Sequence, residues 1–217
     1  MDAHDIESRL QGAFAQRRRG FGDFRVVHTR FTRWARTGVW QQVFETLAED
    51  ADHAYAMLDS TLLRAHQHRA GALNKRGGDQ AIGRGKGGLG TKIHALTDTL
   101  GNPTGFFLSG GQASDLAGAD RWLPGLEADA LLADQASDAD ARVLEVLEAA
   151  DVIAVIPPQR NRVVAREDDK ALYKARYLSE NFFEKLKQFR AIATRDDKLA
   201  RNFLAGIHLA SACILLK

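Results

Sequence analysis

Apolar residues recur at two different spacings along the chain, and the change of spacing predicts where helices and strands lie. Near the N-terminus, Phe31 and Trp34 belong to an amphipathic pattern with the period of a helix, so residues 1–50 are expected to form a short helical arm. Toward the C-terminus the same period predicts two long helices, over residues 170–193 and 198–216.

Between these helical ends, short apolar runs bounded by turn residues predict five strands. They are residues 55–63, 92–98, 105–108, 130–133 and 152–156. The Gly-Asn-Pro turn at 101–103 joins the second and third strands as a hairpin, whereas the fully apolar last two runs are typical of central strands. Helices over residues 115–123 and 139–150 are expected to connect the later strands.

A glycine-rich segment interrupts this pattern. Residues 71–90 contain eight glycines together with basic residues, which predicts a basic loop rather than a helix or a packed strand. Gly83, Gly85 and Gly88 have the G-x-G-x-x-G spacing, but they neither follow a predicted strand directly nor open a helix. A dinucleotide-binding turn is therefore not expected here.

The composition indicates a folded globular protein. Hydrophobic residues make up 45% of the 217-residue chain and charged residues 27%, which fits one domain. No apolar run approaches the roughly 20 residues that cross a bilayer, and the first residues lack the apolar core of a secretory signal. The single cysteine, Cys213, excludes an intrachain disulfide. We therefore expect a cytoplasmic protein with no membrane partner.

The distribution of charge is more informative than the net charge of +2. Residues 64–94 carry seven Lys or Arg against one acid, and residues 170–201 carry nine against four. The stretch between them, residues 127–151, is acidic. This arrangement suits a protein that binds phosphates on either side of a metal-holding centre. Solvated surface faces explain each basic segment taken alone equally well.

Two aspartates occupy unusual positions in the predicted sheet. Asp59 lies inside an apolar strand, where an unpaired carboxylate is costly and therefore needs a metal, a cation or several donors. Capping of a turn or pairing with an arginine is the structural alternative. Asp134 directly follows a buried strand, at the carboxyl end where ligands collect in open α/β sheets. Capping of the next helix is assigned to Asp138, which leaves Asp134 free.

A glutamate in the first C-terminal helix is the third candidate. At 100° per residue, one polar row carries Tyr173, Arg176, Glu180 and Lys187, and an apolar stripe lies on the opposite side. Periodicity alone favours a solvated face with ion pairs for this row. Three carboxylates nevertheless suit Mg²⁺ or Mn²⁺, and a pair of such ions can activate water against a phosphodiester.

Residues 172–198 resemble the end of the catalytic domain in DDE transposases of bacterial insertion sequences. In the branch of that family with a Tyr-Arg-Glu-Lys signature, two, three and six residues separate the four positions, and Tyr173, Arg176, Glu180 and Lys187 have these spacings. Four further stretches resemble the same family in the same order, namely residues 58–72, 82–103, 110–115 and 131–140.

The resemblance implies an α/β fold of the RNase H-like type, a mixed sheet flanked by helices over residues 51–217, after a helical segment at 1–50 that corresponds to a remnant of the repeat-binding region. It implies two Mg²⁺ (or Mn²⁺) ions held by a metal triad, which is Asp59, Asp134 and Glu180. It also implies a DNA-contacting row, which is Tyr173, Arg176 and Lys187. The expected partners are double-stranded DNA, as terminal inverted repeats and target, and a second copy in a homodimer on the nucleoid.

Some positions depart from the family pattern. Gln135, Ala136 and Ser137 follow the second aspartate, where relatives usually end with an aromatic residue, and Asn181 and Asp196 replace the usual Arg and Tyr. Two alternatives to an active transposase therefore stay open. One is a catalytically inactive DNA-binding remnant of such an element, and the other is a metal-dependent nuclease of the same fold.

Overall fold

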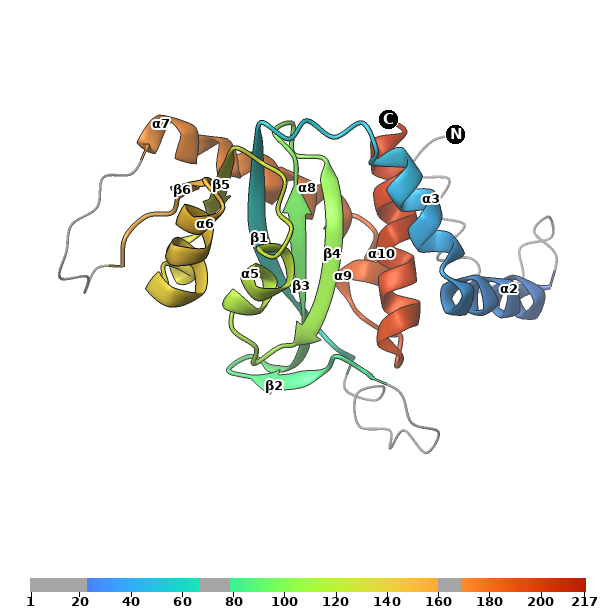
Figure 1. The fold of residues 1–217 in the computed structure, drawn as a ribbon. Coiled ribbons are helices and arrows are strands. Elements are labelled where there is room, and N and C mark those ends of the chain that lie inside the picture. The colour runs from blue at the N-terminus through green and yellow to red at the C-terminus, as the bar shows by residue number, and fades with distance from the viewer. Residues whose placement is uncertain (1–22, 67–78, 160–168) are drawn as a thin grey trace.

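The sheet at the centre of the molecule has six strands, and helices cover both of its faces (Figure 1). The computed structural model describes residues 23–66, 79–159 and 169–217. The strands are β1 (Tyr55–Arg64), β2 (Gly83–Gly85), β3 (Gly88–Thr97), β4 (Pro103–Gly110), β5 (Ala130–Ala133) and β6 (Ile153–Val155).

Strand β1 lies in the middle of the sheet, between an antiparallel and a parallel half. It pairs antiparallel with β3, which in turn pairs with β4, and it pairs parallel with β5, which is followed by β6. The chain thus runs strand, hairpin, helix, strand, helix, strand, helix. This is the RNase H-like order, and the predicted fold class is confirmed.

The helices divide between the two faces of the sheet. Their bounds are α2 (Phe24–Thr37), α3 (Val39–Leu47), α5 (Leu116–Trp122), α6 (Glu145–Ala149), α7 (Lys170–Tyr173), α8 (Tyr177–Lys187), α9 (Arg190–Ala193) and α10 (Ala200–Leu215). A π-helical turn, Asp140–Leu144, leads into α6. No helix in the described part of the chain is long and apolar enough to cross a membrane.

Alternation along β1 sends its side chains into two separate apolar cores. Ala56 and Leu58 pack with residues of α5, β5 and α6 on one face. Leu63 joins the core formed with α8 and α10 on the other face, where Phe182 and Ile207 are buried. Because the first part of β1 is covered on both sides, the Asp59 side chain that follows it gains stability from partners within the protein.

The N-terminal helices are joined by a glycine. Gly38 adopts a left-handed conformation (φ 77°) that ends α2, and α3 then turns back onto α10. Phe44 of α3 is 1% exposed and packs between Phe106 and His208. Helix α2 extends away from the sheet (Figure 1). Residues 24–47 are helical, as expected, and the division of the chain into segments 1–50 and 51–217 stays a prediction.

The prediction of a loop throughout residues 71–90 is wrong for its second half. Gly83–Gly85 pairs with Gly88–Gly90 as a tight hairpin of β2 and β3, while residues 71–78 lie outside the described part. Close packing requires glycine at position 90, where a Cβ atom would lie 2.8 Å from the backbone oxygen of Leu63. A Cβ atom on Gly83 would meet the flexible end of the Gln112 side chain, which can move aside.

The prediction of one continuous helix over residues 170–193 is also wrong. A 3-10 turn, Lys174–Arg176, separates α7 from α8, and α8 ends at Lys187. Phe189 then takes an extended conformation (φ −77°, ψ 102°) before the single turn of α9. Its ring is 5% exposed in the core beside α10, so burial of Phe189 bends the chain where the helical period would have continued.

A buried arginine closes the end of the sheet beside α9. The Arg195 side chain donates to the backbone oxygens of Gln80, Ala81, Asp197 and Lys198, and its guanidinium lies 4.7 Å from the centre of the Phe203 ring. The Arg195 carbonyl accepts from His66 N–H (3.1 Å), and Asp79 accepts from the N–H of Ala200 (3.1 Å). Both ends of segment 67–78 are therefore attached to residues 195–200.

Candidate active site

Asp59 is a half-buried carboxylate on the face of β1 that α8 covers. Its Oδ1 accepts from the Ser60 N–H (2.8 Å), and its Oδ2 accepts from the Ser179 hydroxyl (3.1 Å). The Arg176 Nη1 lies 3.1 Å from the same Oδ2. Burial raises the pKa of Asp59, although Arg176 and the two hydrogen bonds oppose this shift. The strand position therefore supplies both a cation and several donors to this carboxylate.

Asp134 lies beside Asp59 in the sheet. Strands β1 and β5 run parallel with Leu58 opposite Ala133, so the two aspartates follow at neighbouring positions on adjacent strands. The Asp134 Oδ1 accepts from the Gln135 N–H (2.6 Å) and opens a short 3-10 turn, Gln135–Ser137. One oxygen of this carboxylate thus takes part in a cap, and its side chain is exposed at the carboxyl end of β5.

The cap expected from Asp138 is wrong. Helical backbone resumes after Ala139, and its start has no capping bond from a side chain. The Asp138 carboxylate instead accepts from the backbone N–H of Gln159 (2.7 Å), and Asp138 is 7% exposed. It therefore connects the segment after β5 to the chain that leaves β6.

Glu180 reaches the same region from α8, through Arg176. The Arg176 Nη2 forms an ion pair with Glu180 Oε1, one helical turn away, while Nη1 pairs with Asp59. Burial lowers the pKa of Arg176, but Asp59, Tyr173, Glu180 and Asp134 outweigh it and hold that pKa above its usual value. A single guanidinium is therefore the shared counter-ion of Asp59 and Glu180, and the charge of Asp134 acts on it from farther away.

The other two members of the polar row lie at different distances from the acids. The Arg176 guanidinium is 5.9 Å from the centre of the Tyr173 ring, so Tyr173 borders the acidic group. Lys187 forms an ion pair with Glu184 (3.1 Å) and lies two turns beyond Glu180, which is about 10 Å along the helix axis. The structure thus gathers Tyr173 and Arg176 around the acids, and it places Lys187 farther along the same helix.

The donor chemistry of this group fits a hard divalent cation, since it consists of carboxylate oxygens. Within the described ranges, no group of three or more His, Cys, Asp or Glu side chains stands close enough together to hold a metal ion. Arg176 supplies the positive charge among the acids instead. A divalent cation could therefore bind these carboxylates only if the Arg176 guanidinium moves away from them.

Two serines that sequence reasoning missed complete the surroundings of Asp59. Ser179 is fully buried, and its hydroxyl contacts both Asp59 Oδ2 and the Arg176 carbonyl (2.8 Å). Ser60 supplies its N–H to the same carboxylate. The available signal was a small polar residue on the apolar side of α8, one position before Glu180, where the stripe otherwise carries large apolar side chains.

The chain is similar to known proteins in sequence and aligns with one group of solved structures. An uncharacterised Sinorhizobium fredii protein, y4sN, is 47% identical over 57 residues, which are 26% of this chain and 46% of that protein, so the chain spans about half of this relative. A Brucella ovis protein named for the transposase of insertion sequence element IS6501 is 37% identical over 131 residues, 58% of this chain and 98% of that protein. A chain of the pre-cleavage Mos1 transpososome is 12% identical with a TM-score of 0.33, and the alignment covers 98% of this chain and 61% of that chain.

The family model described as the transposase DDE domain matches residues 52–215, which is most of the chain. This range runs from the start of the sheet to the end of α10 and includes all three candidate acids. Together with the Brucella relative, it shows that the chain belongs to the DDE transposase family.

Proposed function

We propose that this domain cuts and joins DNA at the terminal inverted repeats of an insertion sequence. In this proposal Asp59, Asp134 and Glu180 are the ligands of two Mg²⁺ or Mn²⁺ ions. The observation that carries the proposal is that Asp59 on β1 and Glu180 on α8 share one guanidinium, while Asp134 follows β5 at the position next to Asp59 on the neighbouring strand. Three carboxylates in this arrangement supply the negative charge and the oxygen donors that divalent ions require.

Arg176 has two successive roles in this proposal. Without metal its guanidinium balances Asp59 and Glu180, which keeps like charges together at tolerable cost. When bound, the ions would activate water or a 3′-hydroxyl and stabilise the departing 3′ oxygen of the cut strand. The released guanidinium then binds a DNA phosphate, for which its planar donor group is suited.

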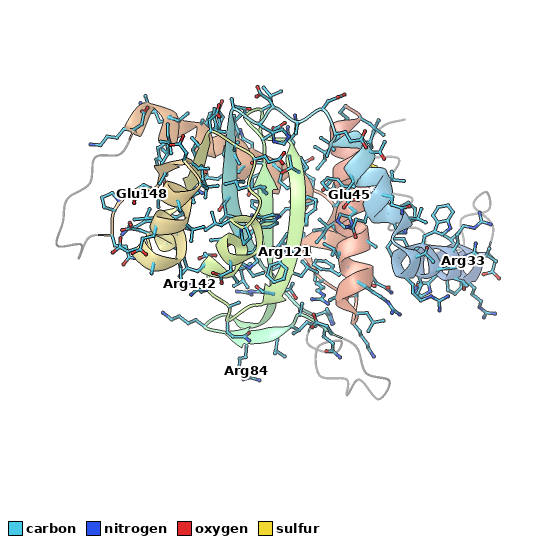
Figure 2. All side chains as sticks on the ribbon, viewed as in Figure 1. Arg33, Glu45, Arg84, Arg121, Arg142 and Glu148 are labelled. Carbon is cyan, nitrogen blue, oxygen red and sulfur yellow. The ribbon has the colours of Figure 1, made fainter. Side chains whose placement is uncertain are left out.

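The expected partner is double-stranded DNA, both as element ends and as target. Tyr173 and Lys187 extend the row on either side of Arg176, and a duplex lying along α8 would meet all three. Arg84 on β2 projects beyond the end of the sheet and adds positive charge there (Figure 2). Since two element ends must meet for transposition, we propose that a homodimer is the active form.

The decisive experiment uses a supercoiled plasmid that carries both terminal repeats of the encoding element. With Mg²⁺ or Mn²⁺ the protein is expected to nick, linearise and join the repeat ends, and Asp59→Asn, Asp134→Asn and Glu180→Gln are each expected to reduce products to the metal-free background. Glu148→Gln is the matched control, because Glu148 is an exposed glutamate on a different helix, α6 (Figure 2). Equal losses in the control would contradict the assignment.

The same experiment separates the alternatives. Cleavage without joined products would replace the transposase by a nuclease of the same fold. DNA binding without cleavage, in a protein whose melting temperature is unaffected by millimolar Mn²⁺, would identify an inactive remnant. In the proposed function Mn²⁺ raises the melting temperature, and Asp59→Asn abolishes this increase.

The DNA-contacting row is tested by the dependence of binding on salt. Arg176→Ala and Lys187→Ala should each weaken binding to repeat and unrelated duplexes alike and flatten the salt dependence by about one unit of slope. Lys185→Ala is the control, since Lys185 is exposed on the same helix but outside the row. An unchanged slope in the first two variants would show that the row is a solvated surface.

A further inference from the structure

Polar side chains also lie behind Asp59, on the opposite face of the sheet. Because neighbouring residues of a strand point to opposite faces, Asp59 faces α8 and Ser60 faces α5. The Ser60 hydroxyl donates to Asp115, the residue before the first turn of α5. The Ser60 N–H donates to Asp59 (2.8 Å). One residue thus contacts two carboxylates, one on each face of the sheet.

Asp115 is itself held by a lysine. The Lys92 Nζ on β3 lies 3.0 Å from Asp115 Oδ1 and donates to the carbonyl of Ala113 (2.8 Å). The side chain of Lys92 is 14% exposed and that of Asp115 is 38% exposed, so the ion pair is partly shielded from water on its lysine side. Burial favours a higher pKa for Asp115, but hydrogen bonds from Ser60 and Lys92 outweigh it and lower that pKa, so the carboxylate is ionised at neutral pH.

The helix that carries Asp115 is fixed closely against the sheet. A Cβ atom on Gly118 of α5 would lie 3.1 Å from both His94 Nδ1 and Leu58 Cδ1, so α5 approaches the sheet to a distance that glycine permits. His94 is fully buried beside Ser60 in the pairing of β1 with β3, and its Nε2 lies 2.8 Å from the Ser109 hydroxyl. Asp115 therefore has little freedom to move relative to Ser60.

We infer that Asp115 and Lys92 are positioning residues for Asp59 and act on it through Ser60. The inference rests on the proposed function, in which Asp59 is a metal ligand. Burying an ion pair costs desolvation, and apolar side chains would attach α5 to the sheet without that cost. The ion pair adds a fixed direction for the Ser60 hydroxyl. It thereby fixes the peptide that joins residues 59 and 60, and with it the Asp59 carboxylate.

The test measures Mn²⁺ affinity by isothermal titration calorimetry and, separately, the melting temperature without metal. Ser60→Ala should weaken Mn²⁺ binding by about tenfold, which is typical when a residue that orients a metal ligand is lost. Ser60→Thr keeps the hydroxyl and should bind Mn²⁺ as the wild type does. Ser109→Ala is the matched control, because it removes a hydroxyl from the same face that contacts His94 rather than Asp115. It should lower the melting temperature and leave Mn²⁺ affinity unchanged.

A double-mutant cycle tests whether Asp115 acts on Asp59 through Ser60. Asp115→Asn should weaken Mn²⁺ binding as Ser60→Ala does, and the double variant should lose little more than either single variant. If Ser60→Ala and Ser109→Ala bind Mn²⁺ equally well while Asp59→Asn abolishes binding, the positioning role is wrong and the proposed function stands. If Asp59→Asn itself binds Mn²⁺ normally, the proposed function fails.

Discussion

At the scale of single residues, buried histidines make stability depend on pH. His208 on α10 is 6% exposed and stacks on Phe44, and burial lowers its pKa to about 4. An unfolded histidine has a pKa of about 6.5. Between about pH 6.5 and pH 4, His208 is therefore protonated in the unfolded chain but not in the folded protein. The stability from His208 is therefore present above pH 6.5 and is lost as the pH falls.

This effect predicts a specific difference between the wild type and His208→Phe. Between pH 7 and pH 5 the wild type should lose about 2 kcal/mol of unfolding free energy through His208, and the phenylalanine variant should lack this part of the loss. Urea unfolding at both pH values measures it. A variant with the pH dependence of the wild type would show that His208 is protonated in the folded protein.

A second prediction at this scale concerns Arg195, which is 1% exposed and whose pKa burial lowers to about 10. Arg195→Met removes the donors of several buried carbonyls and should cost on the order of 3 kcal/mol or more of unfolding free energy. Arg190→Met, at an exposed position on the neighbouring turn, should change it by less than about 0.5 kcal/mol. Chemical denaturation compares the two, and equal effects would contradict the assigned role of Arg195.

At the scale of elements, the glycines of the β2–β3 hairpin are not equivalent. A Cβ on Gly90 would lie 2.8 Å from the Leu63 carbonyl oxygen, whereas one on Gly87 would meet nothing within 4 Å. Gly90→Ala should therefore displace β3 from β1 and destabilise the protein by about 1–3 kcal/mol. Gly87→Ala should be neutral within about 1 kcal/mol. Thermal melting of both variants tests this, and a neutral Gly90→Ala would show that the strands move apart easily.

The sequence predicts an element when the element's own residues determine it, and not when packing against distant residues does. The strands at 55–63 and 130–133 could be predicted because their apolar side chains by themselves indicate a buried strand. The hairpin at 83–90 could not be predicted in this way, because glycines have no side chain whose pattern would indicate a strand, and the close approach of Gly90 to the Leu63 backbone arises only in the fold. The end of α8 could not be predicted either, because Phe189 leaves the helical conformation to pack in a core that residues of α10 complete.

At the scale of the whole molecule, one phenylalanine attaches the N-terminal helices to the sheet and α10. Phe44→Ala should lower the unfolding free energy by about 3–5 kcal/mol, because the ring fills a site between Phe106 and His208. Val43→Ala, at a neighbouring position that is 44% exposed, should cost far less. Urea unfolding followed by tryptophan fluorescence measures both, since Trp34 and Trp40 report on these helices. A small loss for Phe44→Ala would mean that the helices fold apart from the sheet.

In the candidate site, too, some residues could be predicted from their own strand, whereas contacts between distant segments could not. Asp59 and Asp134 could be singled out because each interrupts or ends an apolar strand, and parallel pairing of those strands makes them neighbours. An arginine partner for Asp59 and ion pairs within the polar row were both among the alternatives that the sequence left open. That one arginine, Arg176, makes both pairs could not be predicted, because Asp59 lies more than a hundred residues earlier in the chain. The Ser60–Asp115 contact likewise depends on how α5 packs.

The two attachments made by residues 195–200 have a consequence for how this protein tolerates change. His66 and Asp79 are both bonded to that short stretch, so the described residues on either side of the interval 67–78 are held at one place. Because these two bonds fix the flanking residues, extra residues between them should leave the sheet pairing unaltered, and in general doubling the length of a loop costs only about 0.6 kcal/mol. We therefore expect variants with a changed number of residues in this interval to fold. A peptide epitope placed there would then serve to follow the protein without disturbing the sheet.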